Sequence, residues 1–578
     1  MRSTLPLRVA ACRVPAPRTG VRRRYLMMGG LVILFLALSW FGTLAYRALF
    51  NPDEGRYATI PQEMLASGDW VTPRLNGLKY FEKPPLQYWM TATVFAIFGP
   101  DEWTARLAPA VLGFLALWLV MVTGNRLYGP RGGAVSALVL ASTWAFYLSS
   151  QFLTLDMTLS ACLTFALCAF ILAQREGATA TAHRRWMAVA WIAIALAFLG
   201  KGLVALALPG LALIAYSAWT RDVAVWRQLR PVTGILLLVA LTAPWLVVVQ
   251  SRNPEFFQFF FVHEHFNRFL IPAHSRPGAW WYYVPVLLLG ALPWTPTLVQ
   301  QAVAKLREPR RTVAEGREFS PAKFCIAWIA TALVFFSLSK SKLPAYIVPV
   351  FPAVALLAGA WLRDLAPRKL AVPAWTSIIT GMLLATGFLN IGAWSKFAAL
   401  GSDAADALPW LVVAALALIT AGAAALFLLS VGHRRSAVLA VAAGTFAFWQ
   451  FLFVFLQSVD EHFSSERMVK SVMESTPIPR EMPIYSLQQA DYTVPFYLGR
   501  PVTLVDVRGE LGPGIDAEPD KAIANMDDFR ARWVISQRNV FAVMTTNTYE
   551  LLRQQNFPMH EFARNKRLVI VSRMPGWN

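Results

Sequence analysis

The sequence is poor in charged residues, in cysteine and in histidine, and these scarcities exclude several classes of protein. Only 15% of the 578 residues are charged and 56% are hydrophobic, whereas about a quarter of a soluble domain is charged, so a water-soluble protein is excluded. The four cysteines, Cys12, Cys162, Cys168 and Cys325, show no spacing typical of a zinc site or a disulfide framework. The 53 basic residues outnumber the 33 acidic ones, but they are spread along the chain, so nucleic acid is not an expected partner.

Long apolar runs recur through most of the chain. A helix needs about 17–25 mostly apolar residues to cross a bilayer. The runs predict about thirteen transmembrane helices, beginning near residues 25, 106, 132, 155, 186, 202, 230, 281, 322, 345, 371, 409 and 436. The first run is long enough to span and has no convincing cleavage site after it, so we expect a retained helix and not a signal peptide.

Basic residues gather in alternate connecting segments, beginning with seven arginines in residues 1–24. Because inner loops are usually basic, this tail is predicted to be cytoplasmic. A membrane domain then covers residues 25–457, and three large segments lie outside: 47–105, 251–280 and 458–578. Since most of the polar residues are outside, we expect the chemistry there.

The last segment, residues 458–578, differs sharply in composition from the rest of the chain. Its pattern predicts strands at 483–487, 502–507, 533–536 and 567–572, and helices at 465–474 and 546–555. Such alternation predicts a small soluble α/β domain. The overall fold class is therefore a mainly α-helical, polytopic membrane protein with a C-terminal α/β domain.

The first outer segment, residues 47–105, carries the strongest functional signal. Its charged residues include Asp53, Glu54, Arg56, Glu63, Asp69, Lys79, Glu82 and Lys83. Apolar residues at 57, 60, 64 and 65 recur at helical spacing, which predicts a helix lying in the membrane interface, and a second interfacial helix is expected from residue 86 to 98.

An acidic pair beside basic residues suits the transfer of a sugar from a lipid-phosphate donor. Cations stabilise a departing phosphate, and a carboxylate orients or deprotonates the acceptor. The alternative is a solvated loop with structural ion pairs, and composition alone favours this alternative.

The motifs of this segment resemble those of a known family. These are Asp53-Glu54, Arg56-Tyr57-Ala58, Glu63-Met64-Leu65, Ser67-Gly68-Asp69-Trp70 and Tyr80-Phe81-Glu82-Lys83-Pro84. They are similar to the membrane glycosyltransferases related to protein O-mannosyltransferases (the GT-C superfamily), and more narrowly to the 4-amino-4-deoxy-L-arabinose lipid A transferases. An Asp-Glu pair is common to many lipid-sugar transferases, whereas the run through Glu82-Lys83-Pro84 is much more specific. The likeness extends to the whole layout of spans, outer loop and C-terminal domain.

The resemblance implies an inverting pentosyltransferase at the periplasmic face of a bacterial inner membrane. Its donor would be undecaprenyl phosphate carrying the aminosugar, and its acceptor would be a phosphate group of lipid A. The transfer would lower the negative charge of lipid A and so confer resistance to cationic peptides such as polymyxin. A monomer in contact with membrane lipids is expected. The alternatives are a related transferase with another lipid-linked sugar or a protein hydroxyl acceptor, a lipid-sugar transporter, and a non-catalytic scaffold. A transporter would need charges along its spans, whereas the charges here lie mostly at the outer ends.

Three carboxylates are the catalytic candidates. Asp53 is expected to be the catalytic carboxylate, with Asp156 second and Glu54 beside them. Asp156 lies near the outer end of the fourth span, and a carboxylate at membrane depth is costly and usually functional. The resemblance places Asp156 at the same cavity as Asp53.

The predicted contacts to the donor are mainly basic. They are Arg56, Tyr80, Lys83, Lys201, Arg268, Lys340, Lys342 and Tyr346. Lys201 lies in a tight turn, and two interpretations of it stay open. Its side chain either reaches the lipid headgroups or binds the donor phosphate. Lys340 and Lys342 oppose the basic-inside rule, which suggests anion binding, with attraction to headgroups as the alternative. Arg268 suits a bidentate phosphate contact.

The second outer segment contains His263, Glu264 and His265. Residues two apart do not share a face of a helix, so both histidines could bind one ion only from an extended segment. One of these histidines together with Glu82 is the candidate site for a divalent metal such as zinc. Histidines satisfied at the interface are the favoured interpretation, and no cofactor is required.

Overall fold

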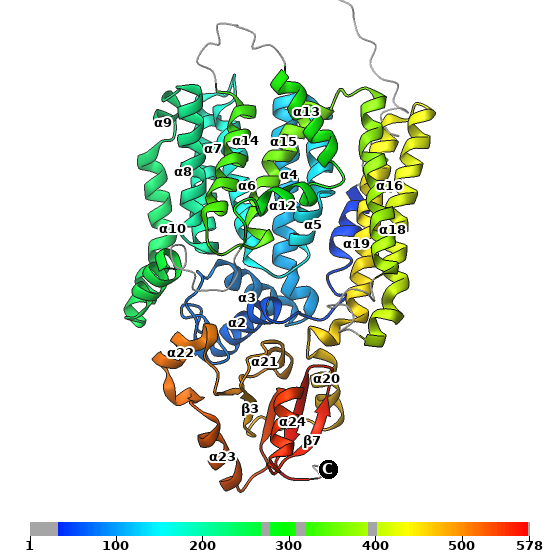
Figure 1. Ribbon diagram of the computed structural model, residues 1–578. Helices are drawn as coiled ribbons and strands as arrows, with labels where there is room; N and C mark the ends of the chain where they lie inside the picture. Colours follow the sequence, from blue (N-terminus) through cyan, green and yellow to red (C-terminus); the bar gives the residue numbers. More distant parts are fainter. Residues whose placement is uncertain (1–29, 31–32, 268–277, 308–318, 391–400, 576–578) are drawn as a thin grey trace, which may run out of the picture.

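The computed structural model describes residues 30, 33–267, 278–307, 319–390 and 401–575. A bundle of long helices forms most of the molecule, and a smaller part that contains a sheet lies at one end of it (Figure 1). We call this end of the bundle the sheet end and the opposite one the far end.

Nine helices in the described residues are long and apolar enough to cross a membrane. They are α4 (Glu102–Ala141), α6 (Leu155–Gln174), α7 (Ala180–Lys201), α10 (Pro231–Arg252), α14 (Pro321–Leu338), η2 with α15 (Pro344–Val350 and Phe351–Leu362), α16 (Pro367–Leu389), α18 (Gly401–Ser430) and α19 (Arg434–Ser458). The shorter elements among them are α5 (Trp144–Ser150), α8 (Val204–Thr220), α9 (Ala224–Arg227), η1 (Gln258–Asn267), α12 (Tyr283–Gly290) and α13 (Thr295–Arg307). The molecule is therefore a multi-pass membrane protein.

The helix α4 contains two of the predicted spans. Its backbone breaks at Gly129, where φ is 78°, a conformation that glycine adopts at little cost, and Pro130 follows. The elements α12 and α13 form a bent pair with an angle of 111°. The predicted first span lies partly outside the described residues, and the count of thirteen stays a prediction.

The C-terminal part contains a six-stranded sheet with the order β5-β4-β3-β6-β8-β7. Its strands are β3 (Ile484–Leu487), β4 (Thr503–Val505), β5 (Ala522–Ile523), β6 (Phe541–Thr545), β7 (His560–Arg564) and β8 (Leu568–Ser572), and its helical elements are η4 (Asp460–His462), α20 (Glu466–Ser475), α21 (Thr493–Leu498), η5 (Gly509–Leu511), α22 (Gly512–Ala517), η6 (Pro519–Lys521), α23 (Met526–Ile535) and α24 (Thr546–Gln554). The first four strands in this order are parallel, and β8 runs antiparallel to β6 and β7. This confirms the predicted α/β domain.

One predicted strand of this domain, residues 533–536, is wrong. Trp533 lies on α23, which starts after the capping side chain of Asn525 and buries Phe529 and Trp533 on one face. The strand comes later, at β6, and its apolar residues are buried in the middle of the sheet.

The first outer segment lies between the bundle and the sheet (Figure 1). It consists of α2 (Asp53–Ser67), the hairpin of β1 (Arg74–Leu75) and β2 (Leu78–Lys79), and α3 (Leu86–Phe98). Both predicted helices are confirmed, whereas their place in the membrane interface stays a prediction. The Thr59 hydroxyl donates to the Tyr492 carbonyl at 2.9 Å. A Cβ on Gly55 would lie 2.9 Å from the Thr493 nitrogen, so the close approach of α2 to α21 requires glycine.

Candidate functional site

Asp53 is the first residue of α2, and 54% of its side chain is exposed at the sheet end. Arg56 lies one turn later, with its Nη2 3.6 Å from Asp53 Oδ1. The same Nη2 lies 2.9 Å from Glu510 Oε1, and Nη1 of this buried guanidinium donates to the Tyr80 hydroxyl at 3.3 Å. The structure thus brings together the predicted residues Asp53, Arg56 and Tyr80.

Glu510 belongs to η5 of the C-terminal domain and was not a sequence candidate. It accepts a hydrogen bond from the Tyr492 hydroxyl at 2.6 Å. Burial raises the pKa of the Glu510 carboxyl, and the nearby Arg56 opposes this shift. The C-terminal domain therefore contributes a carboxyl group to the surroundings of Arg56, and no local pattern in the sequence indicates it.

Asp156 lies in the first turn of α6 and forms an ion pair with Lys201, the last residue of α7. The Lys201 ammonium also lies 4.8 Å from the centre of the Tyr346 ring, at a distance typical of a cation–π contact. Three predicted residues from separate helices therefore form a second group at the sheet end.

Tyr57, on α2, is buried beside Arg56, whose Cζ lies 5.5 Å from the centre of the Tyr57 ring. Burial raises the pKa of its hydroxyl, Arg56 opposes the shift, and the carboxylates of Asp53, Glu82 and Asp156 add to it. The carboxylates of both groups thus belong to the electrostatic surroundings of this phenol, which keep it neutral. Tyr57 was noted in the sequence only for its helical spacing and as part of a motif.

Lys83 joins the two outer segments. Its Nζ lies 3.2 Å from Glu264 Oε2 and donates to the Glu82 carbonyl oxygen at 2.8 Å. Glu264 belongs to η1 and is nearly buried. The ammonium predicted to bind the donor is therefore held between segments that are distant in the sequence.

The two lysines of the turn after α14 differ in their surroundings. Lys340 is exposed, whereas Lys342 is buried and donates to the carbonyl oxygens of Ser337 and Ser339 at 2.8 and 2.7 Å. No carboxylate of the described residues forms an ion pair with Lys342. A buried cation without an anion is costly, so Lys342 is well suited to an anionic ligand.

Several predicted residues cannot be placed. Arg268 lies outside the described residues, and so do the side chains of His263 and His265. In the described part of the chain, no group of three or more His, Cys, Asp or Glu residues could hold a metal ion. Glu82 is buried next to Lys83, 3.9 Å from its Nζ. The metal site stays a prediction.

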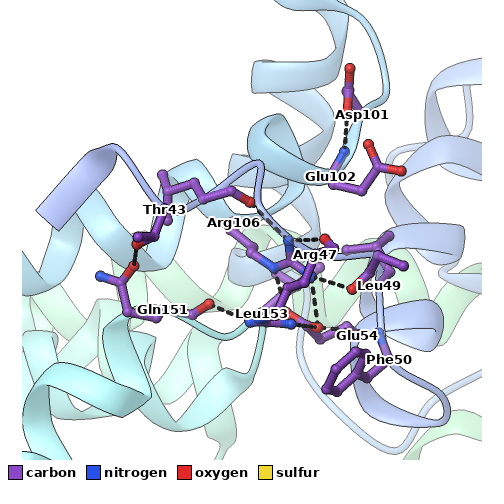
Figure 2. Close-up of polar contacts among 12 residues, drawn as sticks. Thr43, Arg47, Leu49, Phe50, Glu54, Asp101, Glu102, Arg106, Gln151 and Leu153 are labelled. Atoms are coloured by element: carbon purple, nitrogen blue, oxygen red, sulfur yellow. Dashed lines mark hydrogen bonds and ion pairs between the residues drawn. The ribbon is translucent and has the colours of Figure 1, made fainter. Parts of the chain in front are cut away.

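The side chains of Glu54 and its neighbour Asp53 point in different directions, because successive residues of an α-helix are rotated by about 100°. Its side chain is only 2% exposed and lies between Arg47 and Arg106 (Figure 2). Burial would raise the pKa of this carboxyl, but Arg106 and Arg47 lower it to about 2. Glu54 is therefore ionised and enclosed, in contrast to Asp53.

A cavity of about 680 Å³ lies between the first outer segment, η1 and the C-terminal domain. Its lining includes Tyr80, Glu82, Glu255, Glu510 and Asp516. Its size falls within the range of small-molecule sites, and it contains residues of the groups around Arg56 and Lys83. The cavity therefore adjoins Tyr80 and Glu82, which were predicted to contact the donor and a metal, whereas Asp53, Glu54 and Asp156 are not among its lining residues.

This helical membrane bundle, with a sheet-containing domain at one end, has the GT-C fold of membrane glycosyltransferases. The family described as dolichyl-phosphate-mannose-protein mannosyltransferase matches residues 82–248, and the aminoarabinose transferase C-terminal domain matches residues 468–573. The crystal structure of ArnT from Cupriavidus metallidurans bound to undecaprenyl phosphate is 35% identical, with a TM-score of 0.87, over 95% of this chain and 98% of that chain. The chain belongs to the aminoarabinose transferase family.

Curated relatives agree with this assignment. The undecaprenyl phosphate-alpha-4-amino-4-deoxy-L-arabinose arabinosyl transferase of Pseudomonas aeruginosa (strain UCBPP-PA14) is 36% identical over 57% of this chain and 58% of its own length. The protein of the same name from Pectobacterium carotovorum is 32% identical over 62% of this chain and 64% of its own length. The matched regions thus span somewhat less than two thirds of these relatives.

Proposed function

We propose that this protein transfers 4-amino-4-deoxy-L-arabinose from undecaprenyl phosphate to the phosphate groups of lipid A, at the periplasmic face of a bacterial inner membrane. The observation that carries the proposal is that Arg56 contacts Asp53, Tyr80 and Glu510 beside a cavity that Tyr80 and Glu510 line, in a chain that shares its fold and 35% of its residues with ArnT bound to undecaprenyl phosphate. The proposed orientation places the sheet end in the periplasm.

The proposed reaction is a single displacement at the anomeric carbon of the sugar. An oxygen of the lipid A phosphate forms a bond to this carbon while the bond to the undecaprenyl phosphate oxygen breaks, so the configuration inverts. The leaving group departs as an anion and takes the bonding electrons with it. Lys83, Lys342 and Arg268 are the proposed cations that stabilise it.

The two aspartates have separate proposed roles. The acceptor phosphate is already anionic and needs little help from a base, so Asp53 either orients the acceptor or binds the ammonium of the aminosugar. Asp156 is already paired with Lys201, and we propose that this pair shapes the pocket for the sugar ring. A divalent ion at Glu82 and one of the histidines would add a further positive charge near the leaving phosphate, but no step above depends on it.

The test is transfer by the purified protein. Detergent-solubilised protein is incubated with lipid A and with synthetic undecaprenyl phosphates carrying the aminosugar, the corresponding neutral pentose or mannose, and the lipid A is analysed by mass spectrometry. The proposal predicts addition of the aminopentose alone. Addition of another sugar, or labelling of a protein hydroxyl in its place, would identify a related transferase, and no product with any donor would contradict the proposal.

A further inference from the structure

Glu54 lies at the centre of a buried network that joins four segments of the chain (Figure 2). Its Oε1 accepts hydrogen bonds from Arg106 Nε at 2.7 Å and from the Leu153 amide at 3.1 Å. Its Oε2 accepts from Arg106 Nη2 at 2.9 Å and from the Phe50 amide at 3.1 Å. Both oxygens also contact the Arg47 guanidinium.

The guanidinium of Arg106 has no unused donor. Besides its two bonds to Glu54, it donates from Nη1 to the Leu44 and Arg47 carbonyl oxygens and from Nη2 to that of Ala48, each at 2.8 Å. All five N–H groups are therefore engaged, which is the most that this side chain can offer. Arg106 thus fixes residues 44–48, which precede α2.

The Arg47 guanidinium closes the network on its other side. Its Nη2 donates to the Gln151 carbonyl oxygen at 2.7 Å, and its plane lies 3.7 Å from the centre of the Phe152 ring. Gln151 and Phe152 belong to the turn between α5 and α6. Arg47 and Glu54 therefore hold this turn against the start of α2.

The other two predicted catalytic carboxylates lie directly beside these anchors. Asp53 precedes Glu54 in α2, and Asp156 follows Leu153 by three residues, at the start of α6. Since Glu54 binds the backbone on both sides, its position determines how the first turns of α2 and α6 lie relative to each other. An error of about 1 Å in such an arrangement can lower a rate about 100-fold.

We infer that Glu54, with Arg47 and Arg106, is a positioning residue that holds Asp53 and Asp156 in register for the transfer reaction. The inference rests on the proposed function. It assigns Glu54 no contact with the substrate, because its side chain is 2% exposed and both of its oxygens are occupied. The prediction from the sequence that Glu54 is catalytic would then be replaced by an indirect role.

The test compares Glu54→Gln with its neighbour variant Asp53→Asn. Glu54→Gln should lower kcat about 100-fold with little change in the KM for the donor, and amide hydrogen exchange at Phe50 and Leu153 should become faster because their acceptor is weakened. Asp53→Asn should also lower kcat but leave the exchange of both amides unchanged. Glu63→Gln, on the same helix but outside the network, should change neither measurement.

Glu54→Gln leaves two buried arginines without an anion and is at risk of misfolding. Arg47→Gln is the second variant, because it leaves Glu54 paired with Arg106 alone. It should bind undecaprenyl phosphate as the wild type does, with a lowered kcat and faster exchange at Leu153. Wild-type kcat in either folded variant, or a raised KM at unchanged kcat, would overturn the inference.

The two proposals fail in different ways. If the wild-type protein transfers no aminosugar, the proposed function is wrong, and the exchange measurement still decides whether Glu54 joins the starts of α2 and α6. Unchanged exchange at Phe50 and Leu153 in Glu54→Gln would overturn the positioning role even if the wild type is fully active.

Discussion

The two ends of the helical bundle carry their charged side chains in different ways. At the sheet end, charges are buried or shared between distant segments, as in the pairs of Arg56 with Glu510 and of Asp156 with Lys201. The far end has a cavity of about 590 Å³ whose lining includes Arg126, Arg175, Glu176 and Asp222. No ion pair joins any of these four side chains to another described residue.

This difference separates two uses of charge in a membrane protein. Exposed charges between spans establish topology through their sign alone and need no fixed geometry. Charges that act on a substrate must be held in place before it binds, which requires burial and specific partners. The sheet end has this second arrangement, so substitutions there should have far larger effects on transfer.

The largest effect is expected from Asp53→Asn. Loss of this carboxylate should lower turnover by about 100- to 10,000-fold, the range for a positioned acid or base. The melting temperature should not change, because the side chain is half-exposed and its only described ion pair, with Arg56, is long at 3.6 Å. The matched control is Asp222→Asn at the far end, and an equal loss of turnover there would break the comparison.

A smaller effect is expected from Lys342→Met, which removes a buried cation and keeps the length of the side chain. Its affinity for undecaprenyl phosphate should fall about 10- to 100-fold, as when a charge-assisted hydrogen bond is lost. Binding can be followed by thermal stabilisation of the protein at increasing ligand concentration. Lys340→Met, in the same turn but exposed, should bind almost as the wild type does, and equal losses in the two variants would argue for general attraction to anions.

A pH effect on stability is expected from Glu63, which accepts a hydrogen bond from the Gly77 amide on the sheet side of α2. Burial raises the pKa of this carboxyl from its ordinary value of 4.5 to about 7, although the Gly77 amide opposes the shift. The folded protein thus binds the proton more tightly than the unfolded chain, so this contribution to stability is complete below pH 4.5 and is lost as the pH rises through 7.

The melting temperature of the wild type should therefore fall between pH 5 and pH 8 relative to that of Glu63→Gln, which cannot ionise at this position. The measurement is thermal unfolding of both proteins in the same detergent across this range. Parallel curves would show that Glu63 does not titrate in this range and would contradict the raised pKa.

The smallest effect is expected from the far-end double variant Arg126→Gln/Arg175→Gln. Both side chains lack an ion-pair partner among the described residues, so stability should stay within about 0.5 kcal/mol of the wild type, and turnover should be unchanged. The measurements are thermal unfolding and the transfer assay. A large loss of turnover would reveal a function of the far cavity and contradict the division between the two ends.

The sequence predicted correctly that several charged residues of the first outer segment lie close together, and their roles stay predictions. Asp53, Arg56, Tyr80 and Lys83 belong to one run of motifs, and the structure places them around one region. Asp156 and Lys201 were found because charge is rare at the ends of apolar runs. Glu510 was not found, since its neighbours in the sequence form an ordinary surface pattern, and the strand at Phe541–Thr545 was missed while a helix was mistaken for one.

The sequence by itself determined the membrane bundle and the α/β domain, because hydrophobic length and periodicity are local properties that each segment carries independently. It also predicted which segment holds the reactive groups. Only the tertiary structure decided that the Asp53 side chain is exposed while that of Glu54 is enclosed by Arg47 and Arg106. It also decided that Glu510, from the C-terminal domain, contacts Arg56. The physical reason is that a charge is stabilised by partners brought close in space, and an ion pair between distant residues leaves no periodic trace in the sequence.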